Sequence, residues 1–176
     1  MRYIRFMHFA FIVCLLMVDT VIAGVVNSLN IGNITFVSNL AFLGLILLIQ
    51  TDTSKESVIK ASLLSMWMDL NHINSFPIFF VSYVLTVLLM RIWQRQIGGN
   101  IVEFAIIAIV ALFIKESLTF ILITNLNNIH MTYLDFIGQR MFWVIIINAL
   151  FVYPLLEFYK KIHSIILNKT QDLRTY

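Results

Sequence analysis

The sequence has little charge. Only 12% of its 176 residues are Asp, Glu, Lys or Arg, whereas 60% are hydrophobic. An ordinary soluble domain is about a quarter charged. The 12 basic and 9 acidic side chains cannot give a soluble surface to a chain whose mean hydropathy is +0.91. The composition therefore excludes a soluble enzyme, and its high apolar content also excludes a disordered chain.

Side chains that could act in catalysis or bind a metal are also scarce. The single cysteine, Cys14, excludes a disulfide framework and a cysteine-rich metal site. His72 and His130 are expected in separate loops, and two histidines so far apart in sequence are a poor metal signal. The sequence contains no Ser/His/Asp set, Cys/His set or glycine-rich phosphate loop. We therefore expect a protein that is not an enzyme and that holds neither a cofactor nor a metal.

Long apolar runs fill the chain instead. Their continuity favours membrane-spanning helices over barrel strands, which would alternate polar and apolar residues. At about 20 residues per crossing, the length allows about six spans. The fold class predicted is all-α, a polytopic membrane protein in which residues 1–176 form one integral membrane domain. The expected spans are approximately 6–26, 34–50, 57–70, 75–93, 101–124 and 138–159, followed by a cytoplasmic tail over 160–176.

Two segments have a second interpretation. The third span is short for a hydrocarbon core of about 30 Å, so it either continues into 71–74 or is partly re-entrant. The N-terminal run, ending Val21-Ile22-Ala23, also resembles a signal peptide. Its length and the presence of Asp19 favour a retained span.

The positions of Lys and Arg predict the orientation. With the N-terminus in the cytoplasm, ten of the 12 basic residues fall on cytoplasmic segments. These are Arg2, Arg5, Lys55, Lys60, Arg91, Arg95, Lys160, Lys161, Lys169 and Arg174. Both termini are therefore predicted to be cytoplasmic. The same residues explain the pI near 9.1 as contacts to anionic lipids, and we expect no nucleic-acid partner.

Several charged residues are predicted to lie within the membrane. At 1.5 Å per residue, Asp19, Asp69 and Lys115 each lie roughly 20 Å beyond the cytoplasmic start of their spans. Glu116 follows Lys115, and Arg140 lies nearer the outer surface. Because buried charges are costly and usually paired, this intramembrane charge layer is either structural or a pathway or partner-binding site.

Specific pairs can be proposed within this layer. Lys115 would pair with Asp69 or Asp19, and Arg140 with Glu116. Lys115 and Glu116 point about 100° apart on one helix, so we expect them to face different neighbours.

Two residues of the sixth span are predicted to matter for packing. Asn148 lies near the midplane, where we expect it to hydrogen-bond to a neighbouring helix. Pro154 is expected to kink the same span.

Two segments carry a resemblance to a known family. They are Ser65-Met-Trp-Met-Asp69-Leu and Asn148-Ala-Leu-Phe-Val-Tyr-Pro154-Leu-Leu, within six predicted spans with both ends inside. With them the chain resembles the bacterial rod shape-determining protein MreD over about residues 6–161. The family's acidic residue in the fifth span corresponds to Glu116. Ser65 stands where the family has glycine, and Ser is small enough for close helix packing.

The resemblance implies a function. It implies a non-enzymatic scaffold of the peptidoglycan elongation and cell-shape machinery in the bacterial cell membrane. The implied partners are an MreC-like single-span protein and peptidoglycan synthases of the elongation complex.

Two other functions stay open at the level of sequence. The first is the substrate-binding subunit of an energy-coupling-factor vitamin importer, which has a similar size and number of spans. Such subunits usually carry Ala-x-x-x-Ala in the first span, whereas here Ala10 is followed by Cys14. The second is a membrane enzyme acting on lipid, for which Asp69 with His72 is the only candidate cluster.

Overall fold

The computed structural model describes residues 2–28, 37–71, 76–94, 101–126 and 131–172. Every regular element in these ranges is helical, which confirms the predicted all-α class. The elements are α1 (Arg2–Ser28), α2 (Leu40–Leu48), α3 (Ser54–Asn71), α4 (Ile78–Gln94), α5 (Ile101–Leu126), α6 (Tyr133–Phe136), the π-helical turn η1 (Ile137–Met141) and α7 (Phe142–Asp172).

Three helical segments of the described chain are long and apolar enough to cross a membrane. They are Arg5–Val25, Val102–Leu126 and Tyr133–Ser164, and Ile78–Trp93 is a shorter apolar helix. The last of the three is continuous through α6, η1 and α7, so the helix continues past 159 into the predicted tail. Pro154 lies inside α7. These segments indicate a membrane protein.

The second predicted span differs from its expectation. A single helix was expected over 34–50, but α2 covers only Leu40–Leu48 and residues 37–39 are not helical. Nine residues rise about 14 Å, less than half of the hydrocarbon core. The helix starts late because the carboxylate of Asp19 and the side-chain amide of Asn148 bind the backbone at 37–41.

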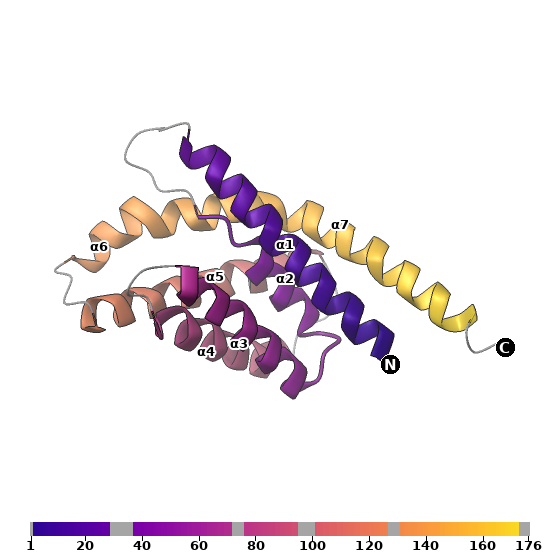
Figure 1. Ribbon diagram of the computed structural model, residues 1–176. Helices are drawn as coiled ribbons and strands as arrows, with labels where there is room; N and C mark the ends of the chain where they lie inside the picture. The colour runs from indigo at the N-terminus through magenta and orange to yellow at the C-terminus, as the bar shows by residue number, and fades with distance from the viewer. Residues whose placement is uncertain (1, 29–36, 72–75, 95–100, 127–130, 173–176) are drawn as a thin grey trace.

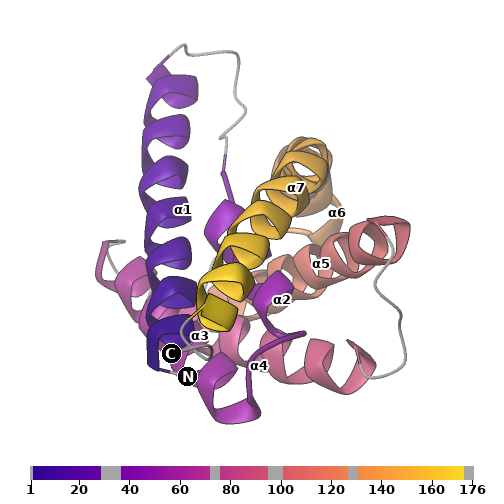
Figure 2. The ribbon, with the colours of Figure 1, turned by 90° about the vertical axis from the view of Figure 1, so that its right-hand side faces the viewer.

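The short helix α2 forms the centre of the molecule. All nine of its residues are buried, as expected for a helix that is apolar on every side. α1 packs against it on one side, and α2 also contacts α3, α4, α5 and α7 (Figure 2). The approach of α1 is close at Gly44, where an added Cβ would lie 2.3 Å from Leu15 Cδ1. An alanine here would force the Leu15 side chain to move, so glycine permits this close approach of the two helices.

The remaining helices form a chain of neighbours around α2. α3 packs on α4, α4 on α5, and α5 on α7. α1 begins and α7 ends at the same end of the molecule (Figures 1 and 2).

Candidate functional site

Four of the five predicted intramembrane charges, all except Asp69, belong to a buried network centred on Lys115. We define the Lys115 network as Asp19, Asn39, Lys115, Glu116, Arg140 and Asn148. The Lys115 ammonium lies 2.8 Å from Glu116 Oε1 and donates a hydrogen bond to Asn39 Oδ1. It also lies over the rings of Phe42 and Tyr83, 5.4 and 5.3 Å from their centroids. A lysine that is 1% exposed is thus held by α2, α4 and its own helix.

Glu116 joins this lysine to the last helical segment. Its side chain is fully buried, and Oε2 accepts a hydrogen bond of 3.1 Å from Arg140 Nε. The predicted Glu116–Arg140 pair is confirmed. The expectation that Lys115 and Glu116 face different neighbours is wrong, because the long lysine chain reaches the adjacent carboxylate although the two Cα–Cβ directions diverge.

Asp19 binds backbone rather than Lys115. Its carboxylate accepts hydrogen bonds of 2.8 Å from the amides of Leu40 and Ala41, and one from the Ser38 hydroxyl. The first amides of a helix have no partner within the helix, and in lipid no water can satisfy them. Asp19 on α1 is therefore the N-terminal cap of α2, and its charge is favourable at that end of the helix dipole.

Asp69 has the same role one hairpin later. It lies near the end of α3 and accepts hydrogen bonds of 3.0 and 2.9 Å from the amides of Phe79 and Phe80 at the start of α4. In both α1–α2 and α3–α4, an aspartate of the first helix caps the start of the second. The two aspartates, which were predicted at a similar depth, therefore have the same structural role.

Asn148 completes the network from α7. Its Oδ1 accepts a hydrogen bond of 2.7 Å from the backbone N–H of Asn39. Its Nδ2 donates to the backbone carbonyls of Val37 (3.0 Å) and Val144 (2.7 Å). The predicted interhelical hydrogen bond is therefore present, and it goes to the non-helical segment before α2. Non-helical backbone at membrane depth is tolerated where protein groups satisfy it in this way.

Ser65 is fully buried on α3. Its hydroxyl donates a hydrogen bond of 2.6 Å to the Ala61 carbonyl within the same helix. The hydroxyl is thus satisfied locally and adds little bulk, which fits the small residue expected there.

A second buried cluster was missed by the sequence reasoning. We define the Asp52 cluster as His8, Asp52, Lys60 and Arg91. Asp52 lies in the turn between α2 and α3, with Oδ1 3.0 Å from His8 Nδ1 and Oδ2 2.5 Å from Lys60 Nζ. Arg91 on α4 donates to the Asp52 carbonyl (3.2 Å) and to Ser57 Oγ (3.1 Å). One aspartate thus ties α1, α3 and α4 together.

The electrostatics of this turn stabilise its carboxylates. Burial alone would raise the pKa of Asp52, but its hydrogen bonds with His8 and Lys60 outweigh that effect and hold the pKa below its ordinary value. Glu56 accepts hydrogen bonds from the backbone and hydroxyl of Thr53, which lower its pKa, and it forms a salt bridge with Arg5. Both carboxylates are therefore ionised at neutral pH.

Some predicted residues cannot be placed. His72, His130, Arg95 and Arg174 lie outside the described residues, as do the side chains of Arg2 and Lys169. Within the ranges that the structure describes, no group of three or more His, Cys, Asp or Glu side chains could hold a metal ion.

Comparison with known proteins gives no relative. No family model, no curated protein and no solved structure matches this chain.

Proposed function

We propose that the chain is a non-enzymatic scaffold of the bacterial cell membrane, of the type that MreD represents in the peptidoglycan elongation machinery. It would bind an MreC-like single-span protein and, through the complex, peptidoglycan synthases. The observation that carries this proposal is that three residues on which the resemblance rests make structural contacts inside the bundle. Asp69 caps α4, Asn148 holds the backbone before α2, and Glu116 joins Lys115 to Arg140.

These contacts favour a scaffold over chemistry. A catalytic or transported-ion site needs polar groups that face a substrate, whereas the polar atoms named above face backbone amides and other side chains. Such a network fixes the relative positions of five elements, α1, α2, α5, η1 and α7. A rigid bundle with a fixed outer surface is what a partner-binding membrane protein requires.

We also propose six crossings with both termini in the cytoplasm. In this arrangement the second crossing consists of α2 and the non-helical segment that precedes it. The arrangement is supported by α1 starting and α7 ending at one end of the molecule (Figure 1). At that end, Lys60 and Arg91 contact Asp52 of the α2–α3 turn, and Arg5 contacts Glu56 in the first turn of α3. Basic residues favour the cytoplasmic side.

Affinity purification from native membranes tests the scaffold. The full chain with a C-terminal tag is crosslinked in cells, solubilised in mild detergent and purified beside an equally abundant, unrelated tagged membrane protein. We expect a single-span coiled-coil protein and wall synthases to be enriched over that control. Recovery of an ATPase module together with a bound vitamin would instead establish the importer subunit.

A further inference from the structure

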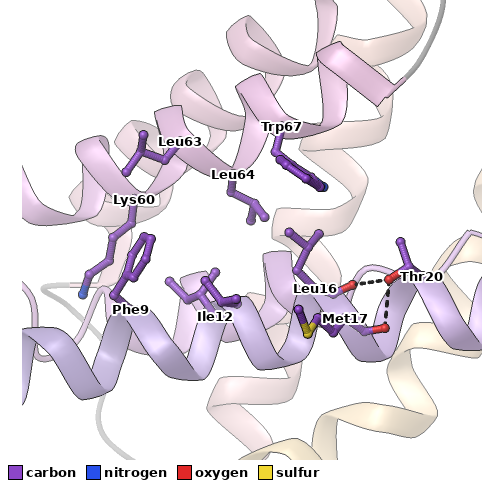
Figure 3. A pocket seen from close by; sticks show the side chains of 10 residues that line it. Phe9, Ile12, Leu16, Met17, Thr20, Lys60, Leu63, Leu64 and Trp67 are labelled. Atoms are coloured by element: carbon purple, nitrogen blue, oxygen red, sulfur yellow. Dashed lines mark hydrogen bonds between the residues drawn. The ribbon is translucent and has the colours of Figure 1, made fainter.

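A groove lies between α1 and α3 (Figure 3). Its volume is about 430 Å³. The α1 wall includes Phe9, Ile12 and Leu16, and the α3 wall includes Leu64 and Trp67. The hydroxyl of Thr20 also lines it but is already bonded to the carbonyls of Leu16 and Met17. Apart from Lys60, the surface that the groove presents to a bound molecule is therefore apolar.

The length of the groove fits one leaflet of a bilayer. From Phe9 to Thr20, α1 rises about 17 Å, whereas half of the hydrocarbon core is about 15 Å. The volume holds about 14 groups of the size of a water molecule, and a methylene group is of similar size. These dimensions fit a single acyl chain. A partner helix that crossed the whole bilayer would need a contact surface about twice as long.

The polar end of the groove is positively charged. Lys60 lines the groove there, and its ammonium uses one of three N–H donors on Asp52. One turn further along both walls, Arg5 and Glu56 form a salt bridge that joins α1 to α3. Lys60 and Arg5, together with the exposed Lys55 and with Arg91 on the Asp52 carbonyl, give this region four basic side chains against the carboxylates of Asp52 and Glu56.

We propose that the groove binds one anionic phospholipid, with an acyl chain between α1 and α3 and the phosphate beside Lys60. The excess of cations at one end selects the anionic headgroup. In the orientation proposed above, this lipid belongs to the cytoplasmic leaflet. The proposal depends on that membrane placement but not on the identity of any protein partner.

Trp67 provides a reporter inside the groove. With Trp93→Phe and Trp143→Phe, it is the sole tryptophan of the full chain. The purified protein in phosphatidylcholine vesicles is titrated with phosphatidylglycerol or phosphatidylcholine brominated on the acyl chains, which quench a tryptophan they touch. We expect half-maximal quenching at an about fivefold lower mole fraction of the brominated phosphatidylglycerol. That factor corresponds to the roughly 1 kcal/mol gained by one lysine near an anionic surface.

Variants separate the groove from the general lipid surface. Val13→Phe fills the groove without changing charge and is expected to abolish the preference, as is Lys60→Gln. Ile59→Phe adds the same bulk at a position on α3 that is 58% exposed and does not line the groove, so the preference should persist.

Three results would overturn the proposal. Equal quenching by the two brominated lipids in the Trp67-only protein would show an unselective surface. A preference that survives Val13→Phe would place the lipid elsewhere. Protection of Trp67 from both lipids would show that protein, rather than lipid, covers the groove.

Discussion

Replacement of Lys115 by methionine tests the central part of the buried network. Methionine keeps the apolar stem but removes the ammonium from Glu116, from Asn39 and from the faces of Phe42 and Tyr83. Breaking a buried ion pair from one side costs about 3–5 kcal/mol. Because Glu116 keeps its bond to Arg140, we expect the lower end, a loss of about 3 kcal/mol in the free energy of unfolding.

The assay is equilibrium unfolding of the full chain in mixed detergent micelles, followed by circular dichroism. The double variant Lys115→Met/Glu116→Gln removes both charges, so its loss should be about 1–2 kcal/mol smaller than the sum of the two single losses. Lys160→Met is the matched control, because its side chain is 53% exposed in an i,i+3 pair with Glu157, and it should change stability by less than about 0.5 kcal/mol. A Lys115→Met protein as stable as wild type, or a double variant whose loss equals that sum, would refute the reasoning.

Three further predictions concern stability in the same assay. Gly44→Ala should cost about 1–3 kcal/mol because its Cβ would meet Leu15, whereas Gly24→Ala, with nothing within 4 Å of an added Cβ, should be neutral or slightly stabilising; equal effects would contradict the close helix contact. Asp69→Ala should lose about 1–2 kcal/mol, and Asp69→Asn, which keeps an acceptor oxygen, clearly less; no difference would exclude the capping role. The pKa of Asp52 in the folded chain lies below its ordinary 3.8, so its ionised form adds stability above that pH, and this contribution is lost as the pH falls through the folded-state value. Asp52→Asn should therefore be less stable than wild type at about pH 6 and converge with it in acid, and a stability gap independent of pH would contradict the ionised pair.

Hydropathy and charge predicted much of the fold. The apolar runs mark each of the long helices, because a chain in lipid must satisfy its backbone internally. The depth estimate also placed Glu116 where Arg140 could reach it, and the structure contains that pair. This pair could be predicted because two opposite charges within apolar segments are each costly to bury unless they bind each other.

Backbone partners were harder to predict. Asp19 was one of two predicted partners of Lys115, whereas its carboxylate caps a helix start that hydropathy alone does not mark. The signal available was Ser38-Asn39, two residues that favour helix N-termini, placed inside an otherwise apolar run. The π-turn that carries Arg140 has no comparable mark in the sequence.

The Asp52 cluster was missed for a different reason. Residues 51–56 are hydrophilic and lie between two predicted spans, so no partner was expected for Asp52. Lys60 and His8 each lie within apolar stretches, and a buried cation needs a carboxylate. Along the sequence, Glu56 lies nearer to Lys60, and Asp19 nearer to His8, than Asp52 does, so the pairing depends on the tertiary fold.

Cysteine accessibility tests most directly the claim that this chain crosses the membrane with the Asp52 cluster at the cytoplasmic end. In a Cys14→Ser background, Lys55→Cys, Ser164→Cys and Asn125→Cys place single thiols at exposed positions in the α2–α3 hairpin, on α7 and at the end of α5. An impermeant maleimide should label Asn125→Cys in intact cells, and Lys55→Cys and Ser164→Cys only after the membrane is opened. Labelling of Lys55→Cys and Asn125→Cys from the same side would contradict the account.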